Sequence, residues 1–128
     1  MSFKDLDSKS QSSFEVPVNF DFFSDLLGRN LLSGNEPSFV FVSTQQALQG
    51  KRLVALYFSA HWCPPCRQFT PIFSEFYSTL KEVHPEAMEV VFLSSDRDFN
   101  GFQRYFSSMP WLSLPFDERF RKESIGSR

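Results

Sequence analysis

Cysteine and histidine are scarce in this sequence, which has two of each among its 128 residues. A structural zinc site takes four such ligands, and His61 and His84 lack the close spacing usual for zinc-binding histidines. Long apolar runs are also missing, and none approaches the roughly 20 residues that span a bilayer as a helix. The formal net charge is only −2, without the positive excess of a general nucleic-acid binder. These absences argue against a zinc module, a membrane-spanning protein and a nucleic-acid-binding protein.

The N-terminal segment gives the expected location and the domain boundary. Residues Met1–Asp5 lack the apolar core of a secretory signal and the composition of a transit peptide. We therefore expect a reducing, cytoplasmic setting, with a nuclear pool also allowed. Residues 1–18 are serine-rich and polar, and we expect them to be a flexible extension. Residues 19–128 have the length of one domain, and 17 phenylalanines provide bulky side chains for its core.

The two cysteines lie three positions apart in the segment Trp62–Cys66, which reads Trp-Cys-Pro-Pro-Cys. The uncharged run Leu53–Phe58 precedes them and predicts a strand buried on both faces, as in a parallel sheet covered by helices. Apolar residues then recur at helical spacing between Phe69 and Val83, which predicts a long helix with one apolar face. Cys63 is therefore predicted where a strand is followed by a helix.

This position favours thiol–disulfide exchange. Backbone N–H groups and the positive end of a helix dipole stabilise a thiolate, so Cys63 is the candidate nucleophile. Cys66, one helical turn further on, can attack a mixed disulfide formed by Cys63 and is the candidate resolving thiol. Pro64 and Pro65 suit the first turn of a helix, where a missing N–H loses no bond, and they stiffen the small ring.

Three other interpretations of the cysteine pair are weaker. Half of a zinc site would need two further ligands that the sequence does not place nearby. A structural disulfide across so small a loop would restrain little of the unfolded chain. Two ordinary buried thiols would not need two prolines between them. The pattern implies no metal and no organic cofactor.

Later segments predict the remaining elements. Val90–Leu93 is a second buried strand, and Phe39–Val42 is an outer strand. Ser94–Asp96 is expected to cap a helix that carries phenylalanines between Phe99 and Phe106. Among single side chains, Trp62 is expected to cover the nucleophile and offer a contact face.

Four segments carry a resemblance to a known family: Tyr57–Arg67, Phe76–Tyr77, Val90–Asp96 and Met109–Leu112. They resemble the tryparedoxin and nucleoredoxin branch of the thioredoxin-like proteins, from about Leu26 to the C-terminus. The Trp-Cys-Pro-Pro-Cys motif separates this branch from thioredoxins proper, which carry Trp-Cys-Gly-Pro-Cys. The resemblance implies an α/β fold with a central sheet flanked by helices.

The resemblance also implies an activity and partners. A tryparedoxin-like or nucleoredoxin-like protein would be a thiol–disulfide oxidoreductase that reduces protein disulfides or peroxidases. Its donor would be a small thiol, trypanothione or glutathione, or a reductase, and a peroxiredoxin could be the acceptor. The alternatives are a redox-dependent regulatory binding module with little turnover, or an inactive fragment of such an enzyme. No nucleic-acid or membrane partner is expected.

Individual residues gain expectations from the resemblance. Tyr57 stands where thioredoxins carry a buried acid, so a proton for the resolving thiol would need another route. Trp111 would lie near the active site and contact substrate, unless it only packs in the core. Arg67 would meet a substrate carboxylate or pair with a neighbouring acid.

One departure concerns the C-terminus. In the family, a segment with a cis-proline, a strand hairpin and a final helix follow the region that ends here at Arg128. The sequence looks like the first two-thirds of the family domain, so we expect Leu53–Phe58 to form an edge of the sheet. We expect the chain either to self-associate through this edge or to be a marginal fold that aggregates.

Overall fold

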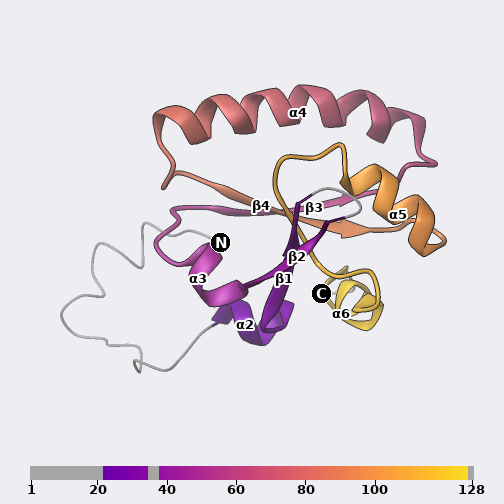
Figure 1. Cartoon of the computed structure of the whole chain (residues 1–128), viewed down its shortest axis with the longest axis horizontal. Coiled ribbons are helices and arrows are strands. Elements are labelled where there is room, and N and C mark those ends of the chain that lie inside the picture. The colour runs from indigo at the N-terminus through magenta and orange to yellow at the C-terminus, as the bar shows by residue number, and fades with distance from the viewer. Residues whose placement is uncertain (1–21, 35–37, 127–128) are drawn as a thin grey trace.

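The computed structural model describes residues 22–34 and 38–126. The predicted extension, residues 1–18, lies outside this part of the chain. Five strands form one sheet in the order β2-β1-β5-β4-β3 (Figure 1). The strands are β1 (Asn30–Ser33), β2 (Val40–Ser43), β3 (Val54–Ser59), β4 (Glu89–Ser94) and β5 (Leu112–Ser113). The helices are α2 (Phe22–Leu27), α3 (Thr44–Leu48), α4 (Pro64–Val83), α5 (Phe99–Phe106) and α6 (Arg119–Gly126).

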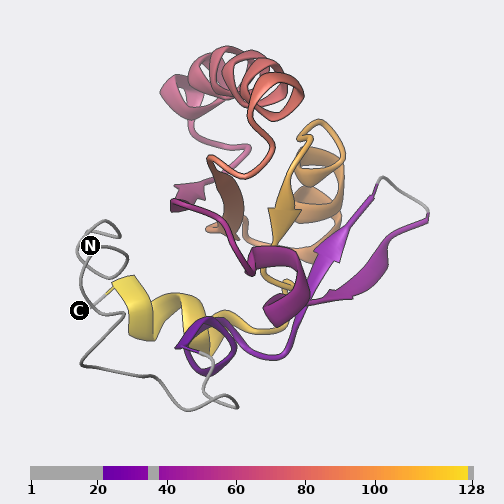
Figure 2. The same ribbon diagram turned by 90° about the vertical axis from the view of Figure 1, so that its left-hand side faces the viewer.

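The sheet is mixed. β3, β4 and β5 run parallel, whereas β1 is antiparallel to both β2 and β5. Helices α4 and α5 cover one face, and α2, α3 and α6 cover the other (Figure 2). This confirms the expected thioredoxin-like architecture of a central sheet flanked by helices.

Strand β4 supplies the centre of both cores because its side chains alternate between the two faces. Val90 and Phe92 pack under α4 and α5, while Val91 and Leu93 pack against the opposite layer. All four side chains are fully buried. The prediction of a buried strand over Val90–Leu93 is confirmed, and the expected outer strand at Phe39–Val42 corresponds to β2 at one end of the sheet.

The N-terminus of α5 differs from the prediction. Asp98 is the N-cap residue, and its Oδ1 accepts the Gly101 N–H at 2.7 Å. Ser94 and Asp96 do not cap the helix because they bond each other, with Ser94 Oγ donating to Asp96 Oδ2 at 2.7 Å. Ser95 and Asp96, which the sequence predicts to cap the helix, therefore belong to the loop between β4 and α5.

Strand β3 forms an edge of the sheet, as expected. In the described part of the chain its only strand neighbour is β4. The prediction that this strand is buried on both faces is wrong for most of its length. Only Ser59 is buried and Phe58 is exposed, because β3 is paired on one side only within the described residues.

Helix α4 also departs from the prediction, since its apolar residues form two stripes and not one face. Phe73, Tyr77 and Leu80 pack on the core. The second group, the outer stripe, consists of Phe69, Ile72, Phe76 and Val83, which are about half to two-thirds exposed. Among the described helices, none combines the length and apolar character needed to cross a membrane.

The unpaired edge of β3 and the outer stripe together predict association. Exposed apolar patches and free strand edges are common sites of protein contact. We expect light scattering to report a mass above that of one chain and Ile72→Lys to reduce it, because Ile72 is 65% exposed. Phe41→Lys on β2, at the opposite end of the sheet, is the control and should leave the mass unchanged. A monomeric parent chain, or an effect of Phe41→Lys alone, would contradict this prediction.

Candidate active site

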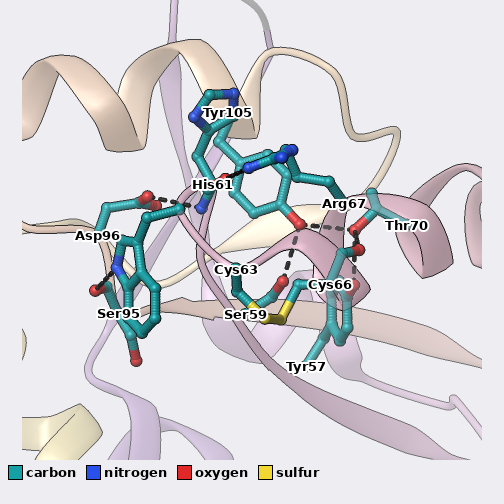
Figure 3. Close-up of a disulfide and its surroundings, with 11 residues drawn as sticks. Tyr57, Ser59, His61, Cys63, Cys66, Arg67, Thr70, Ser95, Asp96 and Tyr105 are labelled. Carbon is teal, nitrogen blue, oxygen red and sulfur yellow. Dashed lines mark hydrogen bonds between the residues drawn. A yellow bond between two sulfur atoms is a disulfide. The ribbon is translucent and has the colours of Figure 1, made fainter.

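Cys63 and Cys66 form a disulfide at the junction of β3 and α4 (Figure 3). Their Cα atoms are 5.2 Å apart, and both residues are half-buried. Cys63 is the N-cap residue of α4, and its carbonyl oxygen accepts the Arg67 N–H at 3.0 Å. Pro64 and Pro65 occupy the first turn, as predicted, where their missing N–H groups cost no helical bond. The predicted position of Cys63 between a strand and a helix is confirmed.

The loop that carries Cys63 is anchored to the end of β4. Asp96 is buried, and its Oδ1 accepts the His61 N–H at 2.8 Å. Trp62 Nε1 donates to the Ser95 carbonyl oxygen at 2.9 Å. Because β3 and β4 are parallel, their carboxyl ends lie at the same edge of the sheet, which brings these groups together. The loop is thereby fixed before α4 begins.

Trp62 is 48% exposed and stands directly before Cys63. The Arg97 guanidinium lies over its ring, with Cζ 4.8 Å from the ring centroid. Such a cation–π contact, together with the bond to Ser95, holds the indole in one orientation. Trp62 therefore presents a fixed, partly exposed aromatic surface beside the disulfide.

Tyr57 and Trp111 pack together against α4 on the core side of the helix. The Tyr57 hydroxyl is 2.6 Å from Thr70 Oγ1, and its ring meets that of Trp111 edge-on with centroids 5.6 Å apart. Trp111 is only 2% exposed and also packs against Phe73. Its side chain thus lies in the core and supports Tyr57, and a contact with substrate would require the core to open.

Arg67 lies on the surface beside the motif. Its Nη1 donates to the His61 carbonyl oxygen, so the side chain braces the loop. Within the described residues no ion pair of Arg67 with an acid is found. The structure therefore brings Trp62, Cys63, Cys66 and Arg67 to one surface, with Pro64 and Pro65 between the cysteines.

Several residues of the site were not identified from the sequence. The sequence predicts that Ser95 and Asp96 belong to a helix cap, whereas their position just after a buried strand is the signal for a role at the carboxyl edge of the sheet. The sequence does not single out Tyr105 among the apolar residues of α5, where it is buried and its ring centroid lies 5.6 Å from that of His61. A tyrosine three residues after Phe102, on the same buried helix face, was the available signal.

The arrangement allows reversible dithiol chemistry. The sulfur atoms are already bonded, and the start of a 20-residue helix favours negative charge at the first cysteine when the bond opens. The fixed loop and the two prolines limit the movement needed to close the bond again.

The anchoring role of Asp96 can be tested by two substitutions. Asp96→Ala leaves the His61 N–H and the Ser94 hydroxyl without their acceptor, so we expect the free energy of unfolding to fall by about 1–3 kcal/mol. Asp96→Asn keeps one oxygen for the His61 N–H and should cost less. Urea unfolding of the three proteins measures the difference. Equal midpoints for all three would show that Asp96 does not anchor the loop.

Comparisons with known proteins agree on one family. Residues 50–126 match the family model described as thioredoxin-like. Probable nucleoredoxin 1 from Arabidopsis thaliana is 50% identical over 96 residues, which are 75% of this chain and 16% of the relative. The chain thus spans only a small part of that relative.

Two solved tryparedoxins share the fold over most of this chain. Native tryparedoxin I from Crithidia fasciculata gives a TM-score of 0.70 at 38% identity, covering 82% of this chain and 69% of that one. Tryparedoxin II complexed with glutathionylspermidine gives a TM-score of 0.67 at 37% identity, covering 77% of this chain and 64% of that one. With the family-model match and the shared fold, these findings identify the chain as a member of the thioredoxin-like family, on its nucleoredoxin and tryparedoxin side.

Proposed function

We propose that this chain is a thiol–disulfide oxidoreductase domain in which Cys63 is the nucleophile and Cys66 the resolving thiol. The observation that carries the proposal is the disulfide between the N-cap residue of a long helix and a residue one turn further on. A thiolate at Cys63 attacks a substrate disulfide, and Cys66 then attacks the Cys63 sulfur of the mixed disulfide. The reduced substrate leaves, and the Cys63–Cys66 bond forms again.

Supporting residues have distinct proposed roles. Trp62 offers its exposed aromatic surface to the polypeptide of a substrate, and Arg67 lies close enough on the surface to meet a substrate carboxylate. Pro64 and Pro65 set the redox potential by stiffening the ring. Tyr57 and Trp111 hold the helix bearing Cys66 from the core side.

The proposed electron donor is a small thiol of the glutathione class, and the acceptors are protein disulfides or a peroxiredoxin. The tryparedoxin complex with glutathionylspermidine supports this class of donor, as does the surface position of the motif. A dithiol that cycles in this way suits a reducing compartment, so we propose a cytoplasmic protein that can also act in the nucleus.

A second candidate function is redox-dependent binding of a protein partner. It is favoured by the outer stripe of α4, which exposes more apolar surface than the disulfide chemistry requires. In this role the Cys63–Cys66 bond would regulate binding, and turnover would be slow.

Insulin reduction by dithiothreitol separates the two functions. If the dithiol turns over, the chain should accelerate insulin precipitation at least about tenfold over dithiothreitol alone, because a stabilised thiolate attacks disulfides faster. Cys63→Ser should remove the acceleration. Phe41→Lys, on the surface of β2, is a control that should retain it. Equal rates for the parent chain and Cys63→Ser would favour the binding module.

A further inference from the structure

Buried hydroxyl groups form a chain behind the disulfide. Ser59 ends β3, Tyr105 lies in α5 and Thr70 lies in α4, and they are 4%, 5% and 3% exposed. The Tyr105 hydroxyl is 2.8 Å from Ser59 Oγ and 2.7 Å from Thr70 Oγ1. Thr70 Oγ1 donates to the Cys66 carbonyl oxygen at 2.9 Å (Figure 3). We call Ser59, Tyr105 and Thr70 the hydroxyl chain.

The direction of each bond in the hydroxyl chain follows from the number of hydrogens, since each hydroxyl has one. Thr70 gives its hydrogen to the Cys66 carbonyl, so its oxygen accepts from Tyr105 and, at 2.6 Å, from Tyr57. Tyr105 has then used its own hydrogen, so Ser59 Oγ donates to Tyr105. Each hydrogen therefore points along the hydroxyl chain toward the backbone carbonyl oxygen of Cys66, where the chain ends.

This orientation is stable over the pH range in which thiols ionise. Burial raises the pKa of the Tyr105 phenol above its ordinary value, although the bonds to Ser59 and Thr70 act in the opposite direction. Tyr105 therefore keeps its hydrogen and remains a donor to Thr70. Fixed dipoles act more strongly in a region from which water is excluded than they do in water.

We propose that Tyr105 is a positioning residue that acts through Thr70 and the Cys66 carbonyl oxygen, whose negative charge the Thr70 hydrogen bond offsets, to stabilise negative charge on the Cys66 sulfur. The inference rests on the proposed thiol–disulfide exchange and adds the group that supports the resolving thiol. It gives a function to a polar cluster that packing alone does not need, since the neighbouring core positions of α5 are phenylalanines, Phe102 and Phe106.

The charge on Cys66 arises when the disulfide is reduced. A glutathione thiolate attacks the Cys63 sulfur, the Cys63–Cys66 bond breaks, and Cys66 leaves with the electron pair as a thiolate that later takes a proton from water. A second glutathione thiolate attacks the glutathione sulfur of the mixed disulfide, which releases the Cys63 thiolate and oxidised glutathione. A more stable Cys66 anion is a better leaving group in the first step.

The test uses Cys66 as the only thiol, in a Cys63→Ser background, so it needs no turnover. Alkylation of Cys66 by iodoacetamide is followed against pH, because only the thiolate reacts. Adding Tyr105→Phe should lower the rate at pH 8 by about three- to tenfold and move the midpoint to higher pH, since the charged form loses its support. The limiting rate at high pH should stay the same, which shows unchanged access to the sulfur.

Tyr77→Phe is the matched control. Tyr77 is also buried in a hydrogen bond, donating to Glu89, but it lies nearer the other end of α4. It should leave the pH profile of Cys66 unchanged. Ser59→Ala, at the far end of the hydroxyl chain, should shift the pH profile of Cys66 in the same direction as Tyr105→Phe but by less. It replaces Tyr105→Phe in the experiment if that variant does not fold.

Two results would overturn the inference. Identical pH profiles with and without Tyr105→Phe or Ser59→Ala would make the hydroxyl chain purely structural. A changed limiting rate with an unchanged midpoint would mean that only access to Cys66 differs. Neither result depends on insulin reduction, so a failure here is distinct from a failure of the proposed oxidoreductase activity.

Discussion

Parallel pairing of β3 with β4 is the constraint on which the site depends. It runs from Val54 opposite Glu89 to Ser59 opposite Ser94, so both strands end at the same level. The segment after β3 carries Cys63, and the segment after β4 supplies the Ser95 carbonyl and the Asp96 carboxylate that hold it. The reactive loop therefore has its shape before a substrate arrives, and α4 begins where the first sulfur lies.

The same pairing leaves the opposite side of β3 open. On that side the strand has no neighbour within the described residues, and α4 adds the exposed outer stripe. One element thus has two roles: its C-terminal end builds the redox site, and its free edge is where we predict association. We therefore expect substitutions at separate positions to alter the chemistry and the association.

Local patterns in the sequence predicted the elements whose signal lies within one segment. The buried strand at Val90–Leu93 and the strand–helix junction at Cys63 are examples. An uninterrupted apolar run indicates a buried strand by itself, and two prolines after Cys63 indicate the first turn of a helix by themselves. Strand β1 has no such signal, since its four residues are too few to show a periodic pattern and become a strand by pairing with β2 and β5. The sequence also does not distinguish the core residues of α4 from its outer stripe, because the pattern of apolar residues does not indicate which of them will pack against the sheet.

The groups that support the disulfide depend on contacts between distant positions. Asp96 meets His61 across 35 residues, and Tyr105 meets Ser59 across 46. Only the fold brings such pairs together, so neither propensity nor spacing reveals them. The motif itself was readable because all of its chemistry lies within five consecutive residues, Trp62 to Cys66.

Trapping of a mixed disulfide tests the central claim, that Cys63 attacks and Cys66 resolves. Cys66→Ser and the parent chain, both fully reduced, are treated with oxidised glutathione and analysed by intact mass. The account predicts that Cys66→Ser keeps one glutathione on Cys63, whereas the parent chain releases it and returns to the Cys63–Cys66 disulfide. A parent chain that keeps the adduct as firmly as Cys66→Ser, or a Cys63→Ser variant that forms it faster than Cys66→Ser, would contradict the assignment.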